Sequence, residues 1–209
     1  TRKMMVRRTD ITQFLWTLGV VLAMCMGETA KCQLILNQSQ PPAALVQNVL
    51  LGSGIFASNI TFNGYPGAAF PPNGTDASRI GRFNGSASNV GFPGGVILAN
   101  GNIQVAQGPN DLMDGTNGGG VLGLNCDIDL IKLSGDPYWQ TSACVMKDVA
   151  KLEFDFIATH DMVDFRYVFG SEEYETYTCT QYNDLFGFFL SGPGITGPYS
   201  NNAMNIAMV

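Results

Sequence analysis

The residues of this chain with the clearest chemical potential lie between Gly170 and Asp184. Glu172, Glu173 and Glu175 fall within four residues, so their carboxylates repel one another unless they point apart, face water or share a cation. Calcium binds oxygen ligands from flexible loops, and carboxylates together with backbone carbonyls suit it. The segment therefore predicts a calcium site with Glu172, Glu173 and Asp184 as ligands. The alternative is a solvated acidic loop.

Aromatic side chains on loops form the second group that could bind a ligand. Sandwich-type lectins combine exposed rings with Asn, Asp and Gly on loops, although aromatic residues pack equally well in a core. Trp139 lies beside Pro137 and Tyr138 in a loop-like stretch and has the greatest expected exposure. The rings expected to contact a ligand are Trp139, Tyr65, Tyr174 and Tyr177.

The sequence offers little for enzymatic chemistry. A glycosidase needs two carboxylates across a cleft, and carboxylates are present, but the sequence gives no distance between them. A serine hydrolase needs a base, yet His160 is the one histidine and no serine lies in a GxSxG motif. The GxGxxG at Gly118–Gly123 has no leading strand and no following helix, so it does not indicate dinucleotide binding. A non-enzymatic protein is favoured, with a secreted glycosidase as the competing class.

The cysteines predict a disulfide in an exported chain. A Cys126–Cys144 bond would close a loop of about 19 residues, worth roughly 3 kcal/mol on a chain-entropy estimate. Cys179 is then left over, to pair with Cys32 or with a residue beyond Val209. Zinc is less favoured, because the chain has no CxxC motif and no cysteine close to its histidine.

Three apolar runs must position the acidic segment: Leu152–Ile157, Val163–Phe169 and Leu185–Leu190. The first two alternate large apolar with polar residues, which is the pattern of half-buried strands. The third is apolar on both faces, so we expect it to be central and covered on both sides. Together they predict the core of a β-sandwich with its chemistry on the connecting loop.

Earlier segments predict one helix and further strands. Apolar residues between Pro41 and Gly54 have the spacing of a short amphipathic helix, expected to cover an edge or end of the sandwich. Turn residues at Asn100–Asn102 predict a hairpin whose second strand is Ile103–Ala106. The additional strands expected are Ile55–Phe62, Ile80–Phe83, Val96–Leu98 and Ile103–Ala106.

Composition limits the class of protein. A chain of 209 residues with 45% hydrophobic content can bury one good core. The net charge of −6 and the scattered basic residues argue against nucleic acid as a partner. After Met26 no segment is apolar for long enough to span a bilayer, so no membrane span is expected in the mature chain.

The first 33 residues predict export. A basic start, an apolar run from Phe14 to Met26 and a polar end are the parts of a signal peptide, and the apolar run is too short for a membrane anchor. Lipidation of Cys25 or Cys32 is disfavoured because no small residue precedes either cysteine. We therefore expect a signal peptide over 1–33 and one domain over 34–209. Both ends of the sequence look cut, which predicts a domain incomplete at its C-terminus.

Two strings give the chain a family resemblance. FRYVFGSEEY at Phe165–Tyr174 and YNDLFGFFLSGPG at Tyr182–Gly194 resemble the signature of the choice-of-anchor L domain. The likeness extends upstream through segments such as Gly91–Gly101 and downstream to Asn205–Val209. It implies a surface or secreted protein of Bacteroidota, exported with the help of the type IX secretion machinery, whose sorting tail would lie beyond the last residue here. It also implies, more loosely, a relation to adhesins and gliding-associated proteins.

The combined prediction is an all-β chain folded as a jelly-roll or lectin-like β-sandwich with one short N-terminal helix. The expected function is that of a non-enzymatic adhesion or binding module, secreted or on the outer face of the outer membrane. Its loops would contact a glycan or a surface protein, with structural calcium as the one cofactor considered. The alternatives are a glycoside hydrolase and a structural spacer of a larger surface protein.

Overall fold

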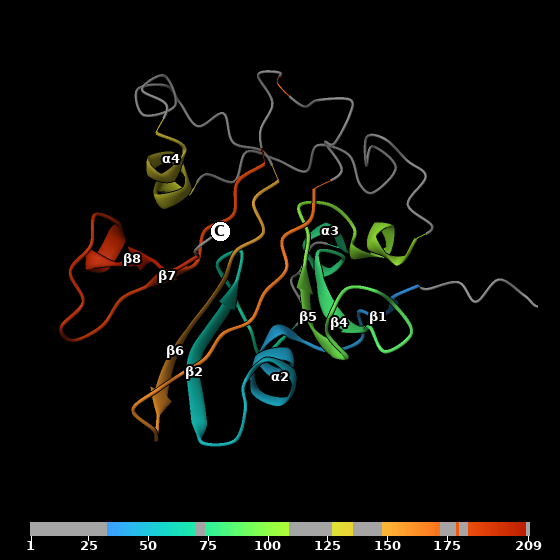
Figure 1. Cartoon of the computed structure of the whole chain (residues 1–209), viewed down its shortest axis with the longest axis horizontal. Helices are drawn as coiled ribbons and strands as arrows, with labels where there is room; N and C mark the ends of the chain where they lie inside the picture. Colours follow the sequence, from blue (N-terminus) through green and yellow to red (C-terminus); the bar gives the residue numbers. More distant parts are fainter. Residues whose placement is uncertain are drawn as a thin grey trace, which may run out of the picture. The chain divides into compact units, whose positions relative to one another are not determined.

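The computed structural model of the chain describes residues 33–69, 74–108, 127–135, 148–171, 179 and 184–207 (Figure 1). The chain divides into two units, Thr1–Cys32 and Gln33–Val209, and all described residues belong to the second. Its strands are β1 (Ile35–Asn37), β2 (Ile55–Phe62), β3 (Tyr65–Pro66), β4 (Ile80–Asn84), β5 (Gly94–Leu98), β6 (Leu152–Ala158), β7 (Phe189–Leu190) and β8 (Met204–Asn205). Its helices are α2 (Pro42–Leu45), η1 (Val46–Leu50), α3 (Gly74–Ala77), η2 (Ile103–Gln107), α4 (Ile128–Ser134) and η4 (Ser200–Asn202).

The described strands form antiparallel sheets. One three-stranded sheet has the order β1-β4-β5, a second has the order β3-β2-β6, and β7 pairs with β8. The predicted all-β class is confirmed. The single predicted helix is found as α2 followed by η1, but the sequence did not indicate the further short helices such as α4.

The pair β2–β6 follows directly from sequence alternation. Leu152, Phe154 and Phe156 face one side of β6 and are half-buried, whereas the residues between them are exposed. The register shifts between Ser58 and Thr61, where Asn59 has a φ of 51° and donates from Nδ2 to Asp155 Oδ2 at 2.6 Å. Such a bulge adds a residue to one strand and increases its local twist.

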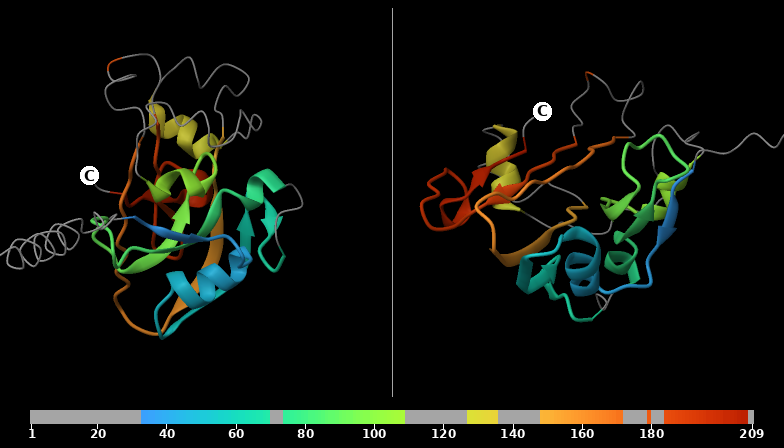
Figure 2. Two further views of the ribbon diagram at one scale, coloured as in Figure 1. Left: turned by 90° about the vertical axis from the view of Figure 1, so that its right-hand side faces the viewer. Right: turned by 60° about the horizontal axis from the view of Figure 1, so that its bottom comes forward.

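A buried cluster of Leu45, Phe62 and Ile80 joins the helix to both three-stranded sheets. Val96 and Leu152 pack against the cluster, so β5 and β6 also contribute to it. The helix begins after Pro41 because a proline at its first position costs no hydrogen bond. Figure 2 shows α2 beside β2 and β4, one strand from each sheet. The helix is thus part of the central core. The sequence pattern predicts it at an edge or end of the sandwich instead.

The predicted strand Ile103–Ala106 is wrong: the segment is the 3₁₀-helix η2. Asn102 starts the helix, because its side chain accepts a hydrogen bond from Gln104 N at 3.0 Å. Ile103 is fully buried and packs against Gly81, where a Cβ would collide with it. Side-chain capping and this burial outweigh the strand propensity of Ile and Val.

The predicted strands Val163–Phe169 and Leu185–Leu190 are mostly absent as hydrogen-bonded strands. Within the described residues of these two segments, Phe189–Leu190 is the part that forms a hydrogen-bonded ladder, and its partner is β8. The side chains are nonetheless in antiparallel register, with Phe165 against Phe188 at 4.8 Å and Tyr167 against Phe186 at 5.0 Å between ring centroids.

The second of these segments is also not covered on both sides, because Phe186 is 37% exposed. The backbone of Phe188 is engaged by the β8 segment instead of by the segment around Phe165. Its N–H donates to Asn205 Oδ1 at 2.9 Å, and its carbonyl accepts from Ile206 N at 2.8 Å. The segment therefore makes backbone hydrogen bonds with the β8 segment and ring contacts with Phe165 and Tyr167.

Hydrogen exchange should distinguish the two kinds of extended segment. The amides of Arg166, Val168 and Phe169 have no backbone hydrogen bond to a described residue, whereas those of β6 pair with β2. We expect the former to exchange much faster at neutral pH, because protection follows hydrogen bonding and burial. Exchange followed by mass spectrometry checks this, and equal protection of both segments would contradict it.

Candidate ligand-binding site

Three aromatic rings lie in a row on the two extended segments. Phe186 is 5.0 Å from Tyr167 and 5.8 Å from Phe169 between centroids, with interplanar angles of 35° and 26°. Tyr167 is 36% exposed, Phe169 50% and Phe186 37%. We call Tyr167, Phe169 and Phe186 the aromatic row. Exposed large apolar side chains gathered in this way are typical of contact surfaces.

A series of ring contacts connects β6 to the two extended segments that carry the aromatic row. Phe154 and Phe156 of β6 are 6.2 Å apart, Phe156 is 6.3 Å from Phe165, and Phe165 meets Phe188 edge to face at an angle of 89°. Edge-to-face and offset arrangements are the favourable geometries of aromatic pairs. Because β6 pairs with β2, these ring contacts fix the position of the two segments. No backbone ladder between the two segments is found among the described residues.

Asp184 lies close to the aromatic row. Ser171 Oγ donates to Asp184 Oδ2 at 2.6 Å, which extends the antiparallel register past Phe169 and Phe186. Asp184 is the described member of the predicted calcium ligands, while Glu172 and Glu173 lie outside the described residues. Within the described ranges, no group of three or more His, Cys, Asp or Glu side chains is placed to hold a metal ion.

Of the other residues predicted to contact a ligand, Tyr65 is the one that the structure describes. Tyr65 is half-buried in β3, and no contact between it and Asp184 or the aromatic row is found among the described residues. Cys179 is exposed and carries a free thiol. The predicted ligand-binding Trp139, Tyr174 and Tyr177 and the predicted disulfide Cys126–Cys144 lie outside the described residues.

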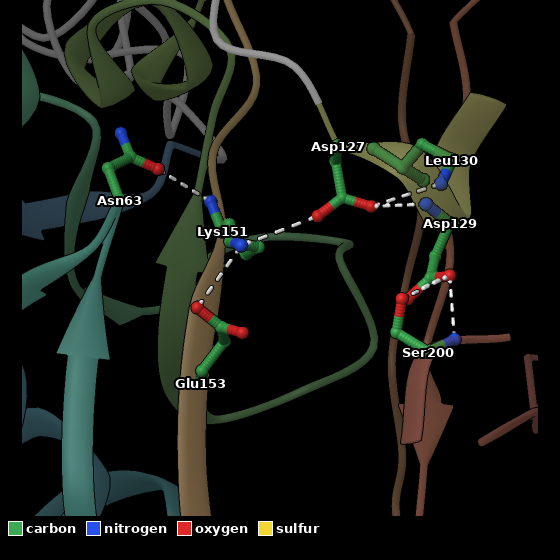
Figure 3. Close-up of polar contacts among 7 residues, drawn as sticks. All are labelled: Asn63, Asp127, Asp129, Leu130, Lys151, Glu153 and Ser200. Atoms are coloured by element: carbon green, nitrogen blue, oxygen red, sulfur yellow. Dashed lines mark hydrogen bonds and ion pairs between the residues drawn. The ribbon is translucent and has the colours of Figure 1, made fainter. Parts of the chain in front are cut away.

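A polar network centred on Lys151 holds α4 against β6 (Figure 3). Lys151 Nζ is 3.2 Å from Glu153 Oε2 and 3.5 Å from Asp127 Oδ2. The other oxygen of Asp127 accepts hydrogen bonds from the backbone N–H groups of Asp129 and Leu130, at 3.0 and 3.1 Å, and so caps α4. One carboxylate therefore links the start of the helix to the sheet.

Two further contacts complete this network (Figure 3). Asp129 Oδ1 accepts from the N–H and the Oγ of Ser200, at 2.8 and 3.0 Å. Asn63 Oδ1 accepts from the backbone N–H of Lys151 at 2.8 Å. The network thereby joins α4 to the turn after β2 and to the segment before β8. Its charged groups are paired with one another, which indicates a structural role.

The pKa of Lys151 is raised above its ordinary value of 10.5. Desolvation lowers this pKa, but the attraction of Glu153 and then of Asp127 raises it by more. A raised folded-state pKa stabilises the fold at pH values below the unfolded-state pKa, and this stabilisation disappears as the pH rises through the folded-state pKa.

We therefore expect the thermal unfolding midpoint to fall at strongly alkaline pH, and to fall less steeply in a Lys151→Met variant. The comparison with the variant separates the contribution of Lys151 from that of every other group that loses a proton at alkaline pH. Unfolding followed by circular dichroism from neutral to alkaline pH measures the difference. Parallel curves for the two proteins would show that Lys151 contributes nothing.

The sequence did not single out Phe169 and Phe186 as site residues. Their alternation with polar neighbours predicts which side of a strand they occupy, but it does not predict whether another element covers that side. The exposure of these rings depends on which elements cover that side, and no local pattern indicates this.

The antiparallel sheets of the described residues define an all-β domain. A family model for the choice-of-anchor L domain matches residues 34–209, and the chain belongs to this family. The family indicates a surface-associated, non-enzymatic module, secreted or at the cell surface. Comparison with curated proteins and with solved structures returned no match. Among the described residues, no helix is long and apolar enough to cross a bilayer.

Proposed function

We propose that the domain binds a glycan through the aromatic row, with Asp184 as a polar partner. The observation that carries this proposal is the exposure of three neighbouring rings beside a carboxylate. Sugar rings present C–H faces that pack on aromatic rings, and their hydroxyl groups donate to acceptors such as carboxylates. Membership in a family of surface modules supports an external ligand of this kind.

The cellular setting is part of the same proposal. Residues 1–33 act as the signal peptide, and the family match that starts at residue 34 supports this boundary. The mature domain is displayed on the outer face of the outer membrane or released, after export by the type IX machinery of a member of the Bacteroidota. Oxidation during export would form the disulfide between Cys126 and Cys144.

Glycan-array binding by the purified chain tests the proposal. We expect Phe186→Ala to weaken binding roughly 30-fold or more, because aromatic anchors of binding surfaces are worth about 2 kcal/mol or more. Phe56→Ala is the matched control, since Phe56 is 64% exposed but lies on β2, outside the aromatic row. Equal binding by the Phe186→Ala variant and the wild type would overturn the site.

The same proteins separate the remaining alternatives. A chain that binds no glycan on the array would favour a protein ligand or a structural spacer, whereas release of shortened products from a bound glycan would establish a glycosidase. Structural calcium is tested by thermal unfolding with calcium and with chelator. A calcium-dependent rise in the midpoint that is lost in Asp184→Asn would support a cation at this residue, and an unchanged midpoint would remove calcium from the proposal.

A further inference from the structure

Asparagine-glycine pairs are sites of spontaneous chemistry, and the described part of the chain contains Asn63-Gly64, Asn84-Gly85 and Asn100-Gly101. The glycine backbone nitrogen attacks the side-chain amide carbon of the asparagine, and the absence of a Cβ on glycine makes the approach easy. The new C–N bond closes a succinimide ring, and the amide leaves as ammonia with the proton from the glycine nitrogen. Water then opens the ring to aspartate or isoaspartate.

Asn63 is held at both ends of its amide. Its Nδ2 donates to Asp76 Oδ1 at 2.8 Å, and its Oδ1 accepts from the backbone N–H of Lys151 at 2.8 Å. Both contacts are partly buried, so the side chain can turn toward Gly64 only after they break. The structure therefore protects this pair.

Asn84 is protected in a different way. Its Oδ1 accepts from Ser86 N at 3.0 Å, and the N–H of Gly85 donates to the carbonyl of Pro93 at 3.1 Å. The attacking nitrogen is thus engaged in a hydrogen bond. Gly85 also lies so close to the Phe92 carbonyl that a Cβ would collide with it, which limits the movement needed for attack.

Asn100 has neither restraint. Its side chain is exposed, and within the described residues neither its amide nor the N–H of Gly101 makes a hydrogen bond. The chain is anchored on either side of the pair. Ala99 N donates to Arg79 O, Gln38 Nε2 donates to Asn102 Oδ1 and Ile103 N donates to Ser78 O, each at 3.0 Å. We propose that Asn100-Gly101 is a deamidation site of this domain and the most reactive of these three pairs.

The position gives the modification a structural consequence. Isoaspartate adds a methylene to the backbone between the two anchored residues, Ala99 and Ile103. Ile103 is fully buried against Gly81 of β4, so a longer connection displaces it or breaks one anchoring hydrogen bond. The aged chain is therefore less stable than the fresh chain.

Incubation of the full chain at neutral and mildly alkaline pH, followed by peptide mapping with mass spectrometry, tests the proposal. Among the three described pairs we expect Asn100 to convert roughly tenfold faster than Asn63 or Asn84, because the hydrogen bonds of the other two must break before attack. The rate should increase with pH, since the glycine amide must lose its proton. Conversion of Asn63 or Asn84 as fast as Asn100 would overturn the proposal.

An Asn100→Gln variant is the control, because its longer side chain closes a six-membered ring much more slowly. It should keep its unfolding midpoint during an incubation that lowers the midpoint of the wild type. If the wild type loses the same amount as the variant after Asn100 has converted, the proposed link between deamidation and Ile103 is wrong.

Discussion

Replacing Arg79 by methionine is expected to lower the free energy of unfolding by about 3–5 kcal/mol, as is usual when one partner of a buried ion pair is removed. The Arg79 side chain is 1% exposed. Its Nη2 is 2.7 Å from Asp148 Oδ1 and its Nη1 is 3.7 Å from Asp76 Oδ1. Removal of the cation leaves two carboxylates in low dielectric without the charge between them. Urea denaturation measures the loss, provided that the unfolding free energy has the same dependence on urea concentration in the variant and the wild type.

Two comparisons separate this effect from a general loss of packing. Lys132→Met removes an ion pair of 3.8 Å with Asp129, but the lysine is 42% exposed, so the expected loss is about 0–1 kcal/mol. Adding Asp148→Asn to Arg79→Met should recover part of the stability, because one buried charge is then removed. A loss below about 1 kcal/mol for Arg79→Met would contradict the assignment of Arg79 as a buried ionic centre.

The second large effect is expected for Phe62→Ala, with a loss of about 3–5 kcal/mol. Phe62 is fully buried and joins Leu45 of α2 to Ile80 of β4, so its removal leaves a cavity between the helix and both three-stranded sheets. The lost stability combines the transfer energy of the ring with the cavity that remains. Thermal and urea unfolding should report the same decrease.

Phe56→Ala is the control on the same strand. Phe56 is 64% exposed, so its truncation should change the free energy of unfolding by no more than about 0.5 kcal/mol. Similar losses at both positions would show that the outward face of β2 is covered in solution, and would contradict the described burial pattern.

Local sequence patterns were sufficient for strands that show apolar alternation and have turn residues on either side. The strand Ile55–Phe62 has the predicted bounds, and β4, β5 and β6 each differ from prediction by two residues or fewer. Their alternation, with turn residues on either side, gives a strand one buried face whatever its partner. The proline at the start of α2 likewise specifies a helix start locally.

The candidate site could be predicted only in part. The sequence located the acidic segment and named Asp184, which the structure places at the end of the aromatic row. It also indicated the extended segments on which the row lies. It could not indicate that Phe169 and Phe186 are exposed, because exposure depends on which elements cover a face. Tyr65, expected on a loop, is half-buried in β3, and its contact with a ligand stays a prediction.

What the sequence determined by itself is therefore the β-rich class, the family, the helix start at Pro42 and the faces of the central strands. Each of these depends on interactions between residues close in the chain or on a motif read directly. The tertiary structure decided the rest. In the folded chain Arg79 is buried between two carboxylates, and Ile103 begins a 3₁₀-helix. The backbone of Phe188 forms its hydrogen bonds with the β8 segment. These outcomes follow from contacts between distant segments, whose energies are comparable to local propensities and are not encoded in any single stretch.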